Sequence, residues 1–300
     1  MKAVISADWH LRADRPRCRL DEDWEASQER IVIAIVAIAK KYNVPLVVVG
    51  DLFDSPTVPH RIVSMLLKHA DDVDEGVYIL PGQHDLPYHQ WKNVDSSAFG
   101  NLWALTGSPW QHATGIRDVG ALGGRELWGD PPLTTPDEII FLHTLVFPSA
   151  KDLPPNVEAR TAGELLAEYP KAKWIFTGDY HRAFHYEKNG RHVVNPGCIS
   201  RQAADFKDYH PQVWAVDTDA GSVEAVELPD TSADVVTDEY LRREEEREER
   251  ITAFVETVKK SEGLTLDFLA NVESMLERNK KTLSPGVVQT IRELMAESEV

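Results

Sequence analysis

LVVVGDLFD, residues 46 to 54, is the stretch of this sequence that decides the fold. Its first four residues are apolar and three of them are β-branched, which is typical of a strand buried on both faces. Gly50 then lets the backbone turn sharply, so Asp51 follows at the carboxyl end of the strand. Ligands bind at this edge of an open α/β sheet. A single carboxylate there is more often a helix cap or a turn residue, so its neighbours decide between the two interpretations.

The same pattern, an apolar strand that ends in polar side chains, recurs four times. The predicted strands and the polar residues after them are Ala3 to Ala7 with Asp8 and His10, Val77 to Leu80 with Gln83, His84 and Asp85, Ile139 to Leu142 with His143, and Trp174 to Thr177 with Asp179 and His181. Asp8 and His10 are two residues apart, so both point the same way from an extended segment. Chance is a poor explanation for this repetition.

The segments between these strands predict helices at about Asp23 to Tyr42, Arg61 to Lys68 and Ala162 to Tyr169. A helix between two strands makes a βαβ unit, with parallel strands and a right-handed crossover. Two hairpins are expected near the end of this region, Phe184 to Asn195 and Val213 to Leu228. Together the hairpins suggest a second, more antiparallel sheet packed on the first.

The polar residues at the strand ends are oxygen and nitrogen donors without a thiolate. Such donors suit Mn²⁺, Mg²⁺, Fe or Zn rather than a structural cysteine site. They are too many for one ion and the right number for two. Two ions about 3.5–4 Å apart can share a bridging carboxylate and hold the attacking and leaving oxygens of a phosphoryl displacement.

The ordered motifs DxH, GDLFD, GxHD, H and GxxH resemble the calcineurin-like metallophosphoesterase superfamily, over about residues 1 to 228. GDLFD, PGQHDLPYH and NPGCISRQ (residues 195–202) look more narrowly like the SbcD-type recombination nucleases, most of all phage-encoded members. The resemblance implies an α/β fold, a two-sheet metallophosphoesterase sandwich flanked by helices. It also implies a nuclease domain over residues 1–229 and a small C-terminal helical extension over residues 230–300.

The resemblance further implies a role for each matching residue. The first ion would be held by Asp8, His10 and His181 together with a bridging Asp51, and the second ion would be completed by Gln83, His143 and Asp179. His84 would be the catalytic imidazole beside the scissile phosphate. Asp54 could orient His84 and keep it cationic, although a turn-stabilising aspartate is an equally good interpretation.

Two positions depart from the family pattern, and both touch the second ion. The family usually has asparagine where Gln83 stands, and a longer glutamine can ligate only if its loop retreats. It usually has histidine where Asp179 stands, and an anionic oxygen there favours hard ions. We therefore expect two divalent ions, Mn²⁺ first and Mg²⁺ second.

The net charge of −17 opposes DNA binding by bulk charge. A local basic patch can still contact phosphates, and the candidates are Arg12, Arg15, Arg17, Arg19 and Arg201. A solvated loop is an equally good interpretation of the four arginines between residues 12 and 19. The charge also favours solubility and discourages non-specific association with DNA.

Beyond a linker at Pro229 to Thr237, the composition changes and the sequence pattern predicts helices. A charged face, Arg242 to Arg250, precedes three apolar stripes, around Ile251 to Val258, Phe268 to Leu276 and Val288 to Met295. One interpretation is a small helical cap on its own domain. The other is a helix-loop-helix that binds a partner, which the resemblance identifies as an SbcC-like coiled-coil ATPase. The resemblance also implies a homodimer.

The N-terminus enters a strand almost at once, so we expect no signal peptide, and no apolar run is long enough to span a bilayer. The two cysteines, Cys18 and Cys198, form no metal-binding spacing, which is usual for a cytoplasmic protein of a bacterial or phage-infected cell.

The expected function is dinuclear-metal-dependent DNA hydrolysis by an activated water, in recombination, repair or replication. The alternatives are a small-molecule phosphodiesterase or phosphatase, and a non-catalytic scaffold with a degenerate second metal site.

Overall fold

The computed structural model of the chain describes residues 1–106, 115–126, 138–229, 235–260, 268–280 and 282–297. The chain forms two compact units, Met1–Thr237 and Asp238–Val300. The first unit has two main sheets flanked by helices, and the second is helical. The expected fold class, a two-sheet α/β sandwich with C-terminal helices, is confirmed.

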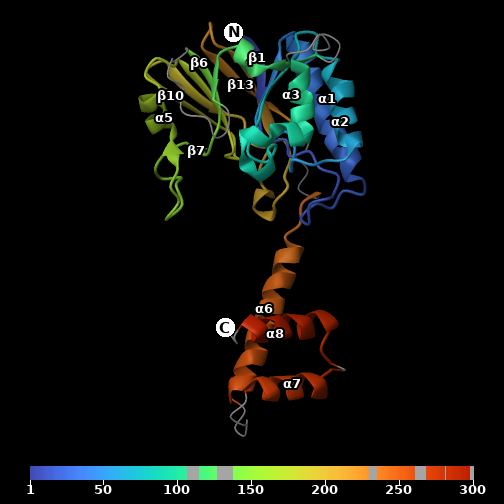
Figure 1. The fold of residues 1–300 in the computed structure, drawn as a ribbon. Helices are drawn as coiled ribbons and strands as arrows, with labels where there is room; N and C mark the ends of the chain where they lie inside the picture. Colours follow the sequence, from blue (N-terminus) through green and yellow to red (C-terminus); the bar gives the residue numbers. More distant parts are fainter. Residues whose placement is uncertain (107–114, 127–137, 230–234, 261–267, 281, 298–300) are drawn as a thin grey trace. The chain divides into compact units, whose positions relative to one another are not determined.

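The first sheet has six strands in the order β13-β12-β1-β2-β3-β4 (Figure 1). Their bounds are Lys2–Ser6 (β1), Leu46–Val49 (β2), Val77–Leu80 (β3), Ile116–Asp118 (β4), Gln212–Asp217 (β12) and Ser222–Glu227 (β13). Strands β1 to β4 are parallel, and β12 and β13 extend the sheet beside β1 as an antiparallel hairpin. The parallel strands are connected through α1 (Trp24–Tyr42), α2 (His60–Ala70) and α3 (Ala98–Thr106).

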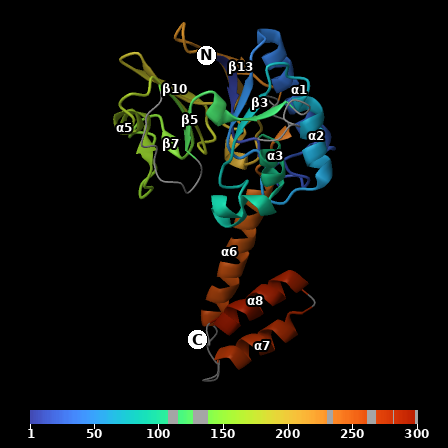
Figure 2. The same ribbon diagram turned by 45° about the horizontal axis from the view of Figure 1, so that its top comes forward.

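Helix α1 shows how the sequence determines these elements. The Asp23 side chain accepts a hydrogen bond from the backbone N–H of Ala26 at 3.0 Å, which caps the start of the helix. Asn43 ends the helix in the left-handed conformation, with φ 51°. The apolar stripe of α1, with Ile31 and Ile35 at its centre, is buried in the cluster that also contains Ile62 of α2. Figure 2 shows α1 and α2 side by side.

The second sheet has five strands in the order β10-β11-β9-β6-β5. Their bounds are Gly124–Glu126 (β5), Ile139–His143 (β6), Trp174–Gly178 (β9), Phe184–Lys188 (β10) and Arg191–Asn195 (β11). Only β10 is antiparallel to its neighbour. Helix α5 (Ala162–Glu168) packs on this sheet, and β7 (Val146–Phe147) pairs with β8 (Arg160–Thr161) in a small separate ladder.

The prediction that both hairpins form a second, antiparallel sheet is wrong. Hairpin β10–β11 joins the second sheet, which is mainly parallel, whereas β12–β13 joins the first. Alternation along a hairpin shows that one face is buried, but the partner strand is chosen by packing between distant segments. Here Trp214 of β12 lies opposite Ile5 of β1. Residues 103–106 form the end of helix α3, and β4 is a short strand farther along the chain.

The two sheets pack face to face, with helices on their outer faces. Alternate residues of β2 divide between the layers: Val47 and Val49 face the second sheet, while Leu46 and Val48 face α1 and α2. Phe176 of β9 contributes to the inner layer from the opposite sheet. This arrangement explains the unbroken apolar run of β2, since both of its faces are buried.

The carboxyl ends of strands from both sheets meet at one edge of this sandwich. The loops after β1 and β2 are joined by hydrogen bonds from the Asp8 N–H to the Gly50 carbonyl (3.1 Å) and from the His10 N–H to the Asp51 carbonyl (3.0 Å). Gly50 has φ 84°, and a β-carbon there would lie 2.0 Å from Nδ1 of His143 on the other sheet. Only glycine lets the two sheets approach so closely.

The second unit consists of α6 (Glu239–Lys260), α7 (Phe268–Arg278) and α8 (Pro285–Glu297). Val272 and Leu276 of α7 are buried with Ile291 of α8, and Phe254 of α6 packs against them. Pro285 begins α8, as expected for a proline at the first helical position. The central residues of the three predicted apolar stripes therefore pack against one another. Among the described residues, no helix has both the length and the apolar character needed to cross a membrane.

Candidate metal centre

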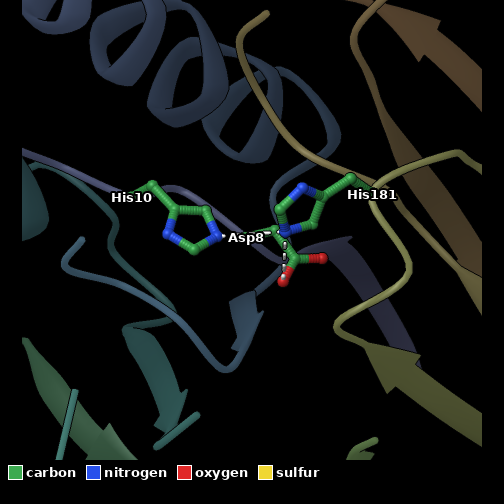
Figure 3. A group of neighbouring side chains, drawn as sticks. All are labelled: Asp8, His10 and His181. Carbon is green, nitrogen blue, oxygen red and sulfur yellow. Dashed lines mark hydrogen bonds and ion pairs between the residues drawn. The ribbon is translucent and has the colours of Figure 1, made fainter. Parts of the chain in front are cut away.

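The structure brings six of the predicted site residues together at the shared edge of the two sheets. They form three overlapping groups whose ligand atoms lie within 4.8 Å of one another: Asp8, His10 and His181; His10, Asp51 and His84; and Asp8, Asp51 and His143. Figure 3 shows His10 and His181 directed toward one another beside Asp8. His10 and His181, which are 171 positions apart in the sequence, thus share one small volume.

Several of these residues have strained backbones. Asp8, His10, Asp51 and Asp179 have φ values of 51°, 44°, 49° and 76°, in the left-handed region that favours glycine. Each such residue costs about 1–3 kcal/mol, and such strain is concentrated at functional sites. The hydrogen bonds between the loops, and two bonds from the Asp179 N–H to the Asp8 carboxylate (3.0 and 3.2 Å), hold the conformations in place.

The spacing of the donor atoms fits divalent ions. Nε2 of His10 lies 3.1 Å from Nε2 of His181, and Oδ2 of Asp51 lies 3.2 Å from Nε2 of His143 and 3.7 Å from Nε2 of His10. Ligands of one octahedral ion at about 2.1 Å are about 3.0 Å apart when adjacent and about 4.2 Å apart when opposite. These donors therefore already have the spacing of shared coordination spheres, with Asp51 between the two histidine groups.

The hydrogen bonds of His143 also favour a ligand role. Its Nδ1 lies 2.8 Å from the Val49 carbonyl, which can only accept, so Nδ1 donates to that carbonyl and Nε2 faces Oδ2 of Asp51 at 3.2 Å. Burial lowers the pKa of His143, but the charge and hydrogen bond of Asp51, together with the charges of Asp8 and Asp179, outweigh burial and raise it to about 10. The same interaction lowers the pKa of Asp51. An electrostatic site that holds a proton this strongly is also a site for a cation.

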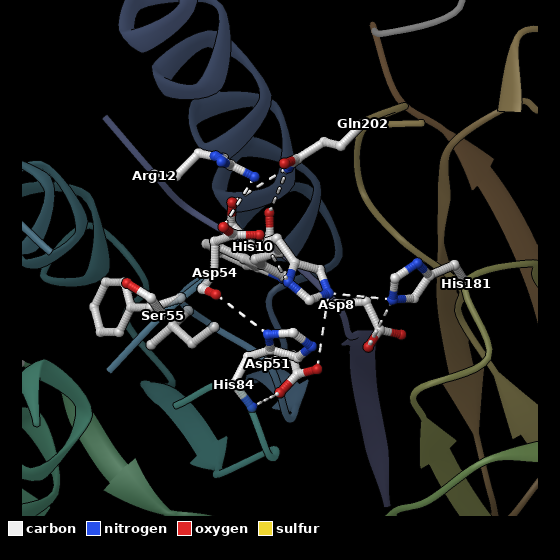
Figure 4. A network of polar contacts seen from close by, with 12 residues as sticks. Asp8, His10, Arg12, Asp51, Asp54, Ser55, His84, His181 and Gln202 are labelled. Atoms are coloured by element: carbon white, nitrogen blue, oxygen red, sulfur yellow. Dashed lines mark hydrogen bonds and ion pairs between the residues drawn. The ribbon is translucent and has the colours of Figure 1, made fainter. Parts of the chain in front are cut away.

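Asp54 differs from its predicted role. Its carboxylate lies 3.5 Å from Nδ1 of His10 and 2.9 Å from a guanidinium nitrogen of Arg12, and only its backbone carbonyl lies near Nδ1 of His84, at 3.2 Å (Figure 4). The prediction that the Asp54 side chain orients His84 is therefore wrong. Burial raises the pKa of Asp54, but His10 and Arg12 outweigh it and lower that pKa. The carboxylate instead positions the ligand His10.

Gln83 and Asp179 form the other end of the centre. Nε2 of Gln83 donates a hydrogen bond to Oδ1 of Asp179 at 2.6 Å. Oε1 of Gln83 and Oδ2 of Asp51 are buried and accept no hydrogen bond from the described residues. Buried oxygens of this kind are costly unless something binds them, so they are suited to binding a cation. The two departures from the family pattern are thus direct neighbours that can act together.

Two residues to which the sequence assigned no role support the centre. The buried carboxylate of Asp85 accepts hydrogen bonds from the N–H groups of Phe53 (2.8 Å), Gly82 (2.9 Å) and Leu52 (3.1 Å), so it joins the loops that carry Asp51 and His84. Burial raises the pKa of Asp85 to about 7. Gln202 donates to the His10 carbonyl at 3.2 Å. The signal for Asp85 was present in the motif GxHD, whereas Gln202 could be placed only by the fold.

The five arginines of the predicted basic patch differ in their exposure to solvent. Arg15 and Arg17 are exposed and Arg12 is half-buried, so these three remain candidates for phosphate contacts. Arg19 and Arg201 are only 2% and 1% exposed, so the prediction that they contact DNA is wrong. Their guanidinium groups hold loops together instead: Arg19 donates to the Arg201 carbonyl (3.3 Å) and Arg201 to the Lys207 carbonyl (2.9 Å).

An exposed arginine that the sequence did not indicate lies next to a ligand. Arg182 follows His181, and its guanidinium group lies over the Phe206 ring at 4.7 Å. It also donates to the Asp205 carbonyl at 3.0 Å. These contacts fix the guanidinium group of Arg182, the residue that follows His181, on the segment around Phe206.

Comparison with known proteins agrees with this geometry. Residues 1–183 match the family model described as calcineurin-like phosphoesterase. No curated protein matches the chain significantly.

Solved structures with a similar arrangement include a novel archaeal phosphodiesterase, 13% identical, with a TM-score of 0.39, covering 76% of this chain and 100% of that chain. They also include a single mutant of Vps29 from Entamoeba histolytica, 12% identical, with a TM-score of 0.36, covering 76% of this chain and 98% of that chain. Vacuolar protein sorting 29 from Cryptosporidium parvum is 14% identical, with a TM-score of 0.33, covering 75% of this chain and 95% of that chain.

Proposed function

Since this chain belongs to the calcineurin-like phosphoesterase family, we propose that it is a metal-dependent DNA nuclease that hydrolyses backbone phosphodiesters. The observation that carries the proposal is the convergence of six side chains from both sheets, in three overlapping groups whose ligand atoms lie within 4.8 Å of one another. We further propose that the protein is the catalytic subunit of an SbcCD-like recombination or repair complex. That narrower assignment rests on the motifs GDLFD, PGQHDLPYH and NPGCISRQ.

In this proposal, some residues of the site bind the metal ions and others contact the substrate. One ion would be held by Asp8, His10, Asp51 and His181, and a second by Asp51, Gln83, His143 and Asp179. Two divalent ions held by these residues, Mn²⁺ or Mg²⁺, would supply an activated water and would neutralise charge on the phosphoryl oxygens.

The chain itself supplies an imidazole and two guanidinium groups around the phosphate. His84 is fixed by two contacts. Its backbone N–H donates a hydrogen bond to Oδ1 of Asp51 (2.9 Å), and its ring Nδ1 contacts the Asp54 carbonyl. Nε2 of His84 is then left to donate a proton to the leaving oxygen. Arg12 and Arg182 would bind neighbouring phosphates and orient the strand.

Replacing His84 by alanine tests this function. We expect the His84→Ala variant to lose Mn²⁺-dependent cleavage of end-labelled linear DNA by at least about 100-fold, because general acid–base catalysis contributes that much. Its Mn²⁺ content, measured by elemental analysis, should match the wild type. The exposed His60, outside the three metal-competent groups, gives a matched control, His60→Ala, that should keep full activity. Undiminished cleavage by His84→Ala would refute the assignment.

A small-molecule phosphodiesterase is the second candidate, and the net charge of −17 favours it because that charge repels DNA. The ratio of turnover on a chromogenic phosphodiester to turnover on DNA, at equal enzyme concentration, separates the two candidates. A DNA nuclease should prefer DNA, and a small-molecule enzyme should prefer the chromogenic substrate.

We also propose that the C-terminal unit binds an SbcC-like coiled-coil ATPase, and that the nuclease acts as a homodimer. Leu241 and Leu294 are 40% and 50% exposed, and a groove of about 640 Å³ lies between α6 and α8, lined by Arg243, Arg247 and Phe254 among others. Apolar and basic groups together suit a helix with an acidic face. Undiminished co-purification of a Leu294→Glu variant with a co-expressed ATPase would count against this site.

A further inference from the structure

The loop after His84 exposes an aromatic side chain at the rim of the metal centre. Tyr88 is 86% exposed, the largest value for a large hydrophobic side chain among the described residues, and His89 beside it is also exposed. Tyrosine contributes most to stability when its large ring is buried. The exposed ring of Tyr88 therefore contributes little to the folding of this unit.

The backbone that presents this ring is strained. Tyr88 and His89 have φ values of 55° and 54°, and two successive bulky residues in the left-handed region are rare. The turn is nevertheless held at both ends. The His89 N–H donates to the Leu86 carbonyl (3.0 Å), the Asn93 side chain donates to the Pro87 carbonyl (3.2 Å), and Leu86 is fully buried. Strain held in place without a packing benefit indicates a functional role.

The position of the turn indicates what it contacts. The rings of His89 and His84 have centroids 6.0 Å apart, and Tyr88 is the adjacent residue. His84 belongs to the metal-competent group with His10 and Asp51. A phosphate bound at the centre would therefore place its own nucleoside, or the next one, within reach of Tyr88.

We propose, on the basis of the nuclease function above, that Tyr88 stacks on an unpaired nucleobase next to the scissile phosphate. Every base has a π-face, so an exposed ring binds a single strand with little sequence preference. The contact also suits a protein with a net charge of −17, because stacking adds affinity that bulk electrostatics do not provide. The substrate class is then DNA with a single-stranded or frayed end, in which the base is free to stack.

Kinetics on a defined single-stranded oligonucleotide test the proposal. We expect Tyr88→Ala to raise KM by about fivefold or more, as the loss of one stacked base predicts, with kcat nearly unchanged. Tyr88→Phe keeps the ring and should match the wild type. An oligonucleotide with an abasic site at the stacked position should be cut equally by the wild type and Tyr88→Ala. Tyr42, near the end of α1 at the opposite edge of the sheet, gives the control variant Tyr42→Ala, which should behave as wild type.

Failure of stacking and failure of nuclease function give different results. If the wild type cuts DNA and Tyr88→Ala has the wild-type KM on the intact strand, or an equally raised KM on the abasic strand, stacking is refuted and the nuclease function stands. If the wild type cuts no DNA, the nuclease function fails, and fluorescence anisotropy with the same oligonucleotides in Ca²⁺ buffer still tests the contact. Equal dissociation constants for the wild type and Tyr88→Ala, or no binding by either, would then overturn the stacking proposal.

Discussion

At the scale of single residues, Asp54 connects the metal centre to the loop after β1. Its carboxylate faces Nδ1 of His10 at 3.5 Å and binds Arg12 at 2.9 Å. Burial alone would lower the pKa of His10, but Asp54 and Asp51 outweigh burial and raise it. A carboxylate behind a ligating histidine fixes the ring and increases the basicity of the nitrogen that binds the metal.

Replacing Asp54 by asparagine should therefore weaken metal binding rather than folding. We expect Asp54→Asn to lower the affinity for Mn²⁺ by about 10–100-fold, since the loss of such an outer partner has this effect. Isothermal titration calorimetry measures it directly. Asp14 also pairs with Arg12 but is exposed, so Asp14→Asn is a matched control that should bind Mn²⁺ as the wild type does. Equal affinities for the two variants would contradict the positioning role.

The convergence of Asp8 and Asp51 could be predicted from the sequence, because each follows a parallel strand and the ends of such strands share an edge of the sheet. His143 ends a strand of the other sheet, so its place beside them followed only from the family resemblance. The partner of Asp54 and the burial of Arg19 could not be predicted from the sequence. Both depend on which way a flexible side chain turns, and that choice is made by neighbours distant in the sequence. Arg19, for example, lies over the Trp24 ring at 4.8 Å and contacts the Arg201 carbonyl, 182 residues away.

At the scale of elements, the loop between β1 and α1 is held by a buried ion pair. Arg19 donates two hydrogen bonds to Asp21, at 2.7 and 3.0 Å, and the two side chains are 1% and 5% exposed. Burial raises the pKa of Asp21, but the bonds from Arg19 and Ser27 outweigh it and lower that pKa below its ordinary value. The ion pair therefore stabilises the fold at pH values above about 4, which is the pKa of Asp21 in the unfolded chain. This contribution is lost as the pH falls through the lower pKa that Asp21 has in the folded chain.

The Asp21→Asn variant should show this pH dependence. Removing one partner leaves a buried charge, so we expect the free energy of unfolding to fall by about 3 kcal/mol at pH 7. The difference from the wild type should shrink in acid below about pH 4, where the wild type loses the same contribution. Urea denaturation at both pH values measures it. The exposed Glu22 gives the control Glu22→Gln, and an Asp21→Asn penalty that does not change with pH would contradict this account of the pair.

Most elements could be predicted from sequence because their signals are local. Strand β3 has the predicted bounds, Val77–Leu80, and α1 begins one residue after its predicted start at about Asp23. Membership of a sheet is not local, since β12 pairs with β1 across 200 and more residues. The hairpin around Gly221 was therefore recognised as a hairpin but assigned to the wrong sheet.

At the scale of the whole molecule, the first unit forms its metal centre from both sheets, so neither sheet holds a complete set of donors. Asp8 and Asp51 follow strands of the first sheet, while His143 and His181 come from the second. The inner apolar layer, which includes Val49 and Phe176, fixes the sheets against each other and so fixes the distances between donors. In the function that we propose, substrate contacts would come from loops of this unit, at Arg12, Arg182 and Tyr88.

The most direct test is diffraction from crystals of the wild-type protein soaked in Mn²⁺, with anomalous data collected at the manganese edge. We predict two anomalous peaks about 3.5–4 Å apart, with Asp51 between them, one beside His10 and His181 and the other beside His143 and Gln83. A single peak, or no peak among these side chains, would contradict a dinuclear centre.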